Sequence, residues 1–165
     1  MTSRTEAAPP FPDAMSPTDY LIAIKQIESV IADYAIGLDS RDMDRFLSAF
    51  HSEATLDVAK GVITGRESIR EWAEEVFSYR TIGHLTGNHR IELHDLNRAS
   101  SVGGGLGLST MPDGAIVFAF AQLTDRYVKI GNIWQIEYRR VALVSAFELP
   151  GAVPIMINGK PVNAG

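Results

Sequence analysis

Residues 16–40 read SPTDYLIAIKQIESVIADYAIGLDS, and this stretch decides the fold. Its apolar side chains recur at intervals that alternate between four and three residues, which places one stripe of them on a single helix face: Tyr20, Ile24, Ile27, Ile31, Tyr34 and Leu38. Ser16 is positioned to cap this helix, because Pro17 and Asp19 occupy its first and third positions. Gly37 and the polar residues 39–42 predict its end. The sequence therefore predicts a long amphipathic helix.

Two shorter helices are predicted further along the chain. The first is capped by Ser40 or Asp42, and its apolar spacing comes from Met43, Phe46, Leu47 and Phe50. The second is opened by the T-x-x-E pattern of Thr64 and Glu67, stops near Tyr79 and buries Ile69, Trp72, Ala73, Val76 and Phe77. Between the two helices, residues 54–59 predict a strand and residues 62–63 its short return.

From Thr81 onward the pattern changes to long strands. They are expected over residues 84–93, 99–110, 115–130 and 133–148, with turn residues between them. Helices followed by a curled antiparallel meander predict an α+β fold, in which the sheet wraps around the long helix as a half-barrel with one open end. Residues 17–150 are expected to form this single domain, with residues 1–16 as a flexible arm and residues 151–165 as a C-terminal tail.

Composition and charge exclude several classes of protein. The 165 residues are 45% hydrophobic and 21% charged, which is typical of a soluble globular domain that is large enough to enclose a pocket. The chain has no Cys, so thiol nucleophiles, thiolate zinc sites and iron-sulfur clusters are excluded. The net charge of −5 argues against a nucleic-acid partner. We expect no membrane span, because the longest apolar stretch covers only residues 115–121. The N-terminal residues do not have the pattern of a signal peptide, so we expect the protein in the cytoplasm.

Three glycines at alternate positions leave one face of a predicted strand without side chains. They are Gly103, Gly105 and Gly107. Two interpretations stay open: the glycines permit a bend or bulge in a strongly curved sheet, or they leave room for a ligand.

Polar residues forced into an apolar interior are the candidates for chemistry. Asp39 continues one face of the first helix, so it either points at the core or ends the helix in solvent. An inward carboxylate requires a hydrogen-bond donor nearby, because an unpaired buried charge costs several kcal/mol. His84 is that donor on the inward interpretation, and Thr86 and Asn88 share its strand face. On the alternative interpretation, His84 is a partly exposed residue that bonds a loop carbonyl.

Three segments carry a resemblance to a known family. Residues 34–54 (YAIGLDSRDMDRFLSAFHSEA), 61–72 (GVITGRESIREW) and 84–88 (HLTGN) resemble the SnoaL-like branch of the nuclear transport factor two-like superfamily, over about residues 18–148. The resemblance implies a cone-shaped α+β half-barrel around a hydrophobic cavity. It also implies that Asp39 and His84 correspond to the Asp-His pair of the scytalone dehydratase and hexachlorocyclohexane dehydrochlorinase branches, and Tyr34 to the tyrosine of bile acid dehydratases.

The implied activity is a lyase or isomerase reaction, a dehydratase-like elimination or proton shift on a small hydrophobic ring-containing molecule. His84 would take the proton, Asp39 would orient its ring, and Tyr34 would donate a hydrogen bond to the leaving group, unless Tyr34 is only a core aromatic. Arg140 is expected to hold an anionic group or to form a surface ion pair. Asn88, Trp72 and Phe50 are expected to contact the substrate as well.

Two other functions stay open, a non-catalytic binder of hydrophobic ligands and the small structural subunit of a ring-hydroxylating dioxygenase. No metal or other cofactor is expected, because no pair of histidines has the spacing of a known ligand set. The outer face of the predicted sheet bears alternating Val, Leu and Phe residues, so we expect a homodimer or homotrimer.

Overall fold

The structure, a computed structural model, describes residues 12, 15–149, 155–157 and 160–162. Its helices are α1 (Pro17–Ser40), α2 (Met43–Ser48) and α3 (Arg66–Phe77). The main sheet consists of β1 (Phe50–Val58), β2 (Gly61–Thr64), β3 (Thr81–Leu93), β4 (Arg98–Thr110), β5 (Ile116–Ile130) and β6 (Ile133–Leu149). A separate two-stranded sheet consists of β7 (Ile155–Ile157) and β8 (Lys160–Val162). The predicted arm (1–16) and tail (151–165) lie mostly outside the described residues.

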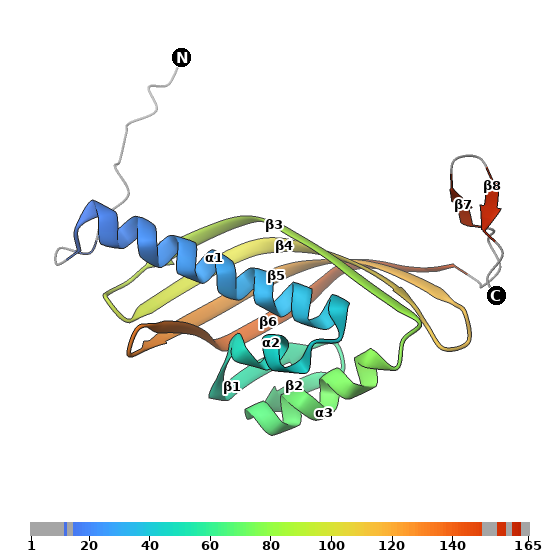
Figure 1. The fold of residues 1–165 in the computed structure, drawn as a ribbon, viewed down its shortest axis with the longest axis horizontal. Helices are drawn as coiled ribbons and strands as arrows, with labels where there is room; N and C mark the ends of the chain where they lie inside the picture. Colours follow the sequence, from blue (N-terminus) through green and yellow to red (C-terminus); the bar gives the residue numbers. More distant parts are fainter. Residues whose placement is uncertain (1–11, 13–14, 150–154, 158–159, 163–165) are drawn as a thin grey trace, which may run out of the picture.

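The main sheet has the strand order β2-β1-β6-β5-β4-β3, so its two edges are β2 and β3. The long strands β3 to β6 form the predicted antiparallel meander, whereas β1 runs parallel to β6 and makes the sheet mixed. Figure 1 shows α1 lying across one face of the curved sheet, with α2 and α3 beside β1 and β2. The α+β half-barrel expected from the sequence is confirmed. No helix in the described ranges is long and apolar enough to cross a bilayer.

The stripe on α1 forms the centre of the core. Ile27, Ile31, Tyr34 and Leu38 are buried between the helix and the sheet. Each buried aliphatic side chain contributes about 1.5–3 kcal/mol, so this face holds α1 against the strands. The predicted cap is also present, because the Ser16 hydroxyl accepts a hydrogen bond from the backbone N–H of Asp19 at 3.1 Å.

Gly37 does not end the first helix, as its sequence position had suggested. The helix continues to Ser40, and Arg41 ends it in the left-handed conformation at φ 57°. A Cβ on Gly37 would lie 2.5 Å from the backbone nitrogen of Phe46. Glycine is therefore required here because the α2 backbone packs directly on α1.

Two other local predictions need correction. Thr64 does not cap α3, because it belongs to β2 and pairs with Thr55; the cap is Gly65, which turns the chain at φ 87° without a side-chain hydrogen bond. Phe50 does not continue the second helix, because α2 ends at Ser48 and Phe50 begins β1.

The sheet has several register irregularities, and two of them are β-bulges that decide which candidate side chains face the interior. One lies in β3 between Gly87 and Arg90, where Asn88 has a φ of 55°. The other lies in β6, where the partner of Tyr127 is Ile136 but the partner of Arg126 is Tyr138. Because side chains alternate between the two faces of a sheet, one extra residue exchanges the faces of the residues that follow, as far as the next irregularity in the strand.

Candidate active site

The C-terminal end of α1 and the start of β3 are held together by Arg41. Its guanidinium donates hydrogen bonds to three backbone carbonyls, one at the last residue of α3 and two in the segment that leads into β3: Phe77 at 3.1 Å, Tyr79 at 2.6 Å and Arg80 at 3.1 Å. The last turn of α1 therefore lies beside the first residues of β3. This contact places Asp39 opposite His84.

The carboxylate of Asp39 binds His84 at two points. Its Oδ1 lies 2.6 Å from Nδ1 of the imidazole, and its Oδ2 accepts the backbone N–H of His84 at 2.8 Å. The two side chains are 29% and 26% exposed, so the pair is partly shielded from water. Both the position and the orientation of the ring are set by this contact, which agrees with the inward interpretation of Asp39.

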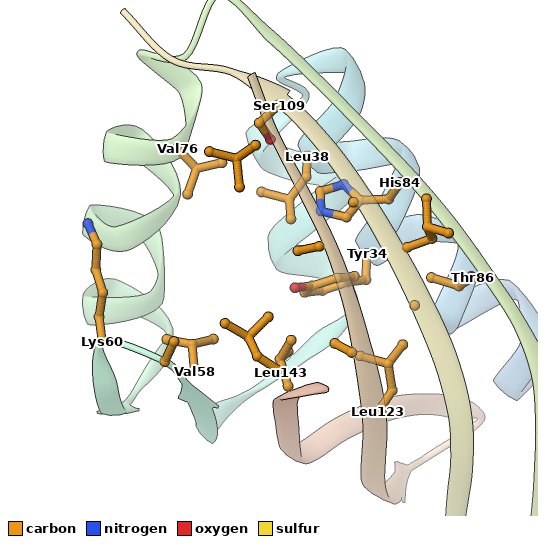
Figure 2. A pocket seen from close by; sticks show the side chains of 18 of the residues that line it. Tyr34, Leu38, Val58, Lys60, Val76, His84, Thr86, Ser109, Leu123 and Leu143 are labelled. Carbon is orange, nitrogen blue, oxygen red and sulfur yellow. The ribbon is translucent and has the colours of Figure 1, made fainter. Parts of the chain in front are cut away.

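The imidazole forms part of the wall of a cavity of about 280 Å³ between α1, α3 and the inner face of the sheet. Apolar side chains from all of these elements line the cavity, among them Leu38, Val76, Leu123 and Val141. Figure 2 shows that one ring nitrogen of His84 is directed toward the cavity. Because Asp39 occupies Nδ1, this free nitrogen is Nε2. The site therefore presents one polar ring atom to a mainly hydrophobic space.

Tyr34 is the second polar group that faces the cavity. Its side chain is only 5% exposed, and Figure 2 shows its hydroxyl oxygen directed into the cavity. The guanidinium carbon of Arg139 lies 4.1 Å from the centre of its ring, the geometry of a cation–π contact. Burial raises the pKa of the Tyr34 phenol, and the Arg139 cation partly opposes that rise. The phenol therefore stays protonated at neutral pH, as a hydrogen-bond donor.

Arg139 belongs to a buried polar cluster behind Tyr34. It donates to both carboxylate oxygens of Asp125, from Nε at 2.8 Å and from Nη2 at 2.7 Å, and neither side chain is exposed. The hydroxyl of Tyr127 donates to the same carboxylate at 2.8 Å, and Ser101 bonds both groups. The negative charge of Asp125 further raises the pKa of the buried Tyr127 phenol beyond the effect of burial itself. A planar bidentate pair of this kind fixes the Arg139 guanidinium under the Tyr34 ring.

The four predicted substrate-binding residues lie in different places. Trp72 lines the cavity, as predicted. Phe50 is fully buried behind Tyr34, with ring centres 5.9 Å apart, and does not line the cavity. Asn88 is an exposed residue at the bulge in β3, and Arg140 forms a surface ion pair with Asp57 at 3.6 Å. The bulge in β3 thus turns Asn88 away from the interior, and the bulge in β6 does the same to Arg140. Arg139 takes the inward position that the alternation pattern had assigned to Arg140.

His89 takes the inward position in β3. Both of its ring nitrogens are buried without a hydrogen-bond partner, and burial lowers the pKa of the imidazole. The ring fills the space beside Gly103, where a Cβ would lie 2.3 Å from Nδ1. Gly105 and Gly107 instead line the cavity. The three glycines therefore serve two purposes: Gly103 makes room for the ring of His89, and Gly105 and Gly107 leave space in the cavity.

Arg41, Arg139 and His89 are the residues that sequence reasoning missed. The signal for Arg41 was present, because a residue directly after a helix often closes it through backbone carbonyls. Across the part of the chain that the structure describes, no three His, Asp or Glu side chains are grouped as they would be around a metal ion.

The chain has a curved sheet, a long helix that covers one face of it and a cavity between the two, so it is a small α+β protein with an internal pocket. Residues 19–140 match the SnoaL-like domain, and the chain belongs to this family. Comparison with curated proteins finds no match.

Solved structures of the same fold include proteins with named activities. The hexachlorocyclohexane dehydrochlorinase LinA type 3 of Novosphingobium barchaimii superposes with a TM-score of 0.76 at 22% identity, over 83% of this chain and 97% of that chain. A scytalone dehydratase-like protein of Novosphingobium aromaticivorans gives a TM-score of 0.75 at 19% identity, over 85% and 97%. A protein of unknown function from Mycobacterium tuberculosis gives 0.69 at 26% identity, over 79% and 77%. These likenesses establish the fold of the chain.

Proposed function

We propose that the protein is a lyase or isomerase that removes a proton from a carbon atom of a small hydrophobic ring-containing substrate. The observation that carries this proposal is the 2.6 Å contact between Asp39 and Nδ1 of His84 at the wall of the cavity. A base held in this way is oriented before the substrate arrives, which is the usual arrangement of a catalytic histidine. Relatives of the same fold carry the names of a dehydrochlorinase and a dehydratase-like protein, which supports a lyase.

In the proposed reaction, His84 acts as the general base. Asp39 accepts the Nδ1 proton, so the neutral ring keeps its lone pair on Nε2, on the side of the cavity. Nε2 takes the proton from carbon, and the electron pair of the broken C–H bond forms a new double bond to the adjacent carbon. In an elimination, the bond from that adjacent carbon to the leaving group breaks and the group departs with its electron pair. In a proton shift, the adjacent carbon is a carbonyl carbon whose π electrons move to oxygen as an enolate, and the imidazolium then returns the proton to another carbon. The imidazolium that results lies against the Asp39 carboxylate, which stabilises the charge.

Tyr34 is proposed to assist where negative charge develops. In an elimination, its hydroxyl donates a hydrogen bond to the leaving group; in a proton shift, it donates to the oxygen of the enolate. The raised pKa of the phenol keeps this donor protonated. A donor that is already oriented in an apolar cavity stabilises such a charge more strongly than water does.

The shape and chemistry of the cavity support the substrate class. A volume of about 280 Å³ with mostly apolar lining suits one small ring system that carries few polar groups. The hydroxyls of Thr86 and Ser109 also line the cavity and could hydrogen-bond a substrate oxygen.

The test is a panel of ring-containing alcohols, ketones and halides incubated with the protein in D₂O. Loss of a C–H signal by NMR detects both elimination and proton exchange. His84→Ala is expected to reduce the rate about 10²- to 10⁴-fold, and Asp39→Asn to reduce it as well, because the ring loses its acceptor. His94→Ala, an exposed histidine bonded to Ser100, is the matched control.

Two results would contradict the proposal. Unchanged turnover in His84→Ala would exclude this residue as the base. Binding of panel compounds by ligand-detected NMR, with neither turnover nor exchange in any of them, would favour the non-catalytic binder instead.

A further inference from the structure

The mouth of the cavity is marked by residues that line it and are also exposed to solvent. Among the described residues that line the cavity, three are exposed: Ala59, Lys60 and Leu143. The first two form the turn between β1 and β2, and Leu143 belongs to β6, which is hydrogen-bonded to β1. Figure 2 shows Lys60 and His84 on opposite sides of the cavity. A substrate that fills the cavity therefore has one end at the His84 ring and the other near this turn.

Lys60 places a permanent charge at the mouth. It is the only lysine, arginine, aspartate or glutamate among the described residues that line the cavity. The two-residue turn that carries it is closed by the pairing of Val58 with Gly61, whose φ of 129° favours glycine. The ammonium group of Lys60 donates a hydrogen bond at 3.0 Å to the carboxylate of Glu75, in the last turn of α3. The negative end of the α3 dipole also favours a cation at this place.

The ion pair between Lys60 and Glu75 is open to exchange. The two side chains are 66% and 64% exposed, and exposed pairs contribute little to stability because water and salt screen both charges. The ammonium group has three donors, one of which binds Glu75. The hydrogen bond from Glu75 and its negative charge raise the pKa of Lys60, so the group stays positive at neutral pH. A second carboxylate therefore has room to bind Lys60 beside Glu75 or in its place.

The rest of the lining decides where an anionic group of a substrate lies. Apart from His84 and Lys60, the cavity wall is apolar or carries uncharged hydroxyls, and burying an unpaired carboxylate there is costly. At the mouth the same carboxylate stays in contact with water and gains the Lys60 cation. Arg140, which one interpretation of the sequence assigned to the binding of an anionic group, is paired with Asp57 instead.

We propose that Lys60 binds a carboxylate of the substrate at the mouth of the cavity. The inference rests on the proposed function, because it places the ring of the same substrate in the cavity and the reacting carbon at His84. It narrows the substrate class to ring compounds that carry an acidic group on the side remote from the reacting carbon. Glu75 holds the ammonium group at the mouth before the substrate arrives and competes with the substrate carboxylate. Lys60 is thus a binding residue that selects by charge and takes no part in the proton transfer.

The test compares the binding of naphthoate with that of acetylnaphthalene, its neutral isostere, by NMR titration. The wild type is expected to bind the acid about five to ten times more tightly, and about 0.5 M salt should remove most of this preference. Lys60→Met keeps an apolar stem along the cavity wall, so it should lose the preference and bind the ketone as the wild type does. Glu75→Gln removes the competing carboxylate and should tighten the binding of the acid about two- to fivefold.

Lys25→Met is the matched control. Lys25 forms a comparable exposed ion pair with Glu28 on α1, at 2.7 Å, and neither residue lines the cavity. This variant is expected to keep the wild-type preference for the acid. Equal affinity of the wild type for the two compounds overturns the inference, and so does a preference for the acid that persists in Lys60→Met. Binding of neither compound also contradicts it, because the cavity then takes no ring of this size.

These binding measurements separate the inference from the proposed function. If the preference for the acid depends on Lys60 but no panel compound reacts, only the proposed lyase or isomerase activity fails. If turnover that depends on His84 is found but the preference for the acid is absent, only the role of Lys60 fails.

Discussion

Replacing Gly103, Gly105 and Gly107 one at a time with alanine measures how the space on the inner face of β4 is used. None of the three has a positive φ, so alanine fits the backbone at each position. Alanine in place of such a glycine stabilises by about 0.4–1 kcal/mol, because the unfolded chain loses freedom. Any difference among the three variants therefore reports the contact that the new methyl group makes.

The structure orders the three variants. At Gly107 the nearest atom is Cδ2 of His84 at 3.6 Å, an ordinary contact, so we expect a gain of about 0.5 kcal/mol in the free energy of unfolding. At Gly105 a methyl carbon of Leu123 lies at 3.2 Å and must shift slightly, so we expect about zero net change. At Gly103 the ring of His89 lies at 2.3 Å and must be displaced, which costs about 1–3 kcal/mol of overpacking; set against the gain of about 0.5 kcal/mol, this leaves a net loss of about 0.5–2.5 kcal/mol.

The assay is urea unfolding at pH 7.5, followed by circular dichroism, with the slope of the transition required to match the wild type. A Gly103→Ala variant as stable as Gly107→Ala would refute the assignment of His89 to the inner face. The double variant Gly103→Ala/His89→Ala isolates the cause. Its loss should be smaller than the sum of the two single losses, because the ring that the methyl group displaces is already absent.

Arg139→Met is expected to lower the free energy of unfolding by about 3–5 kcal/mol, because it leaves the buried Asp125 carboxylate without its cation. In urea unfolding, adding Asp125→Leu to this variant should recover part of the loss. If the loss of the double variant equals the sum of the two single losses, the two residues are not a coupled pair. His89 gives a pH dependence. Its pKa is lowered in the folded state, so the unfolded chain binds the proton first and stability falls as the pH decreases below about 6.5, by at most about 1.4 kcal/mol per pH unit. The free energy of unfolding of His89→Phe is measured against that of the wild type from pH 7 to pH 5. The difference should shift in favour of the variant as the pH falls, and a difference that stays constant would contradict the burial of this imidazole.

Periodicity predicted the elements that depend on a repeated pattern. The stripe of α1 and its cap at Ser16 are confirmed, and so is the antiparallel meander. These features follow from many residues that agree with one another, so a single exception changes little. The pairing of β1 with β6 was beyond reach, because neither strand carries a local signal for a partner far along the chain.

Bulges explain why only part of the candidate site could be predicted. A strand pattern with period two assigns every residue to a face, but it assumes that no residue is inserted. In β3, His84 and Thr86 lie before the bulge and line the cavity as their spacing indicated. Asn88 lies at the bulge and faces solvent. Only the positive φ of that asparagine distinguishes the site of the bulge, and asparagine is among the few residues that accept such a φ without a large cost.

The contact between Asp39 and His84 depends on Gly37 and Arg41, two residues that the sequence pattern predicted only to end α1. Gly37 lets α2 pack closely on α1 instead of ending it, so the helix reaches Ser40 and Asp39 lies in its last turn. Arg41 then ends the helix in the left-handed conformation and binds the segment that leads into β3. A carboxylate in this turn faces the partial negative charge of the helix end, which is unfavourable without a donor. The backbone N–H and ring of His84 supply two, so the helix end and the candidate base require each other.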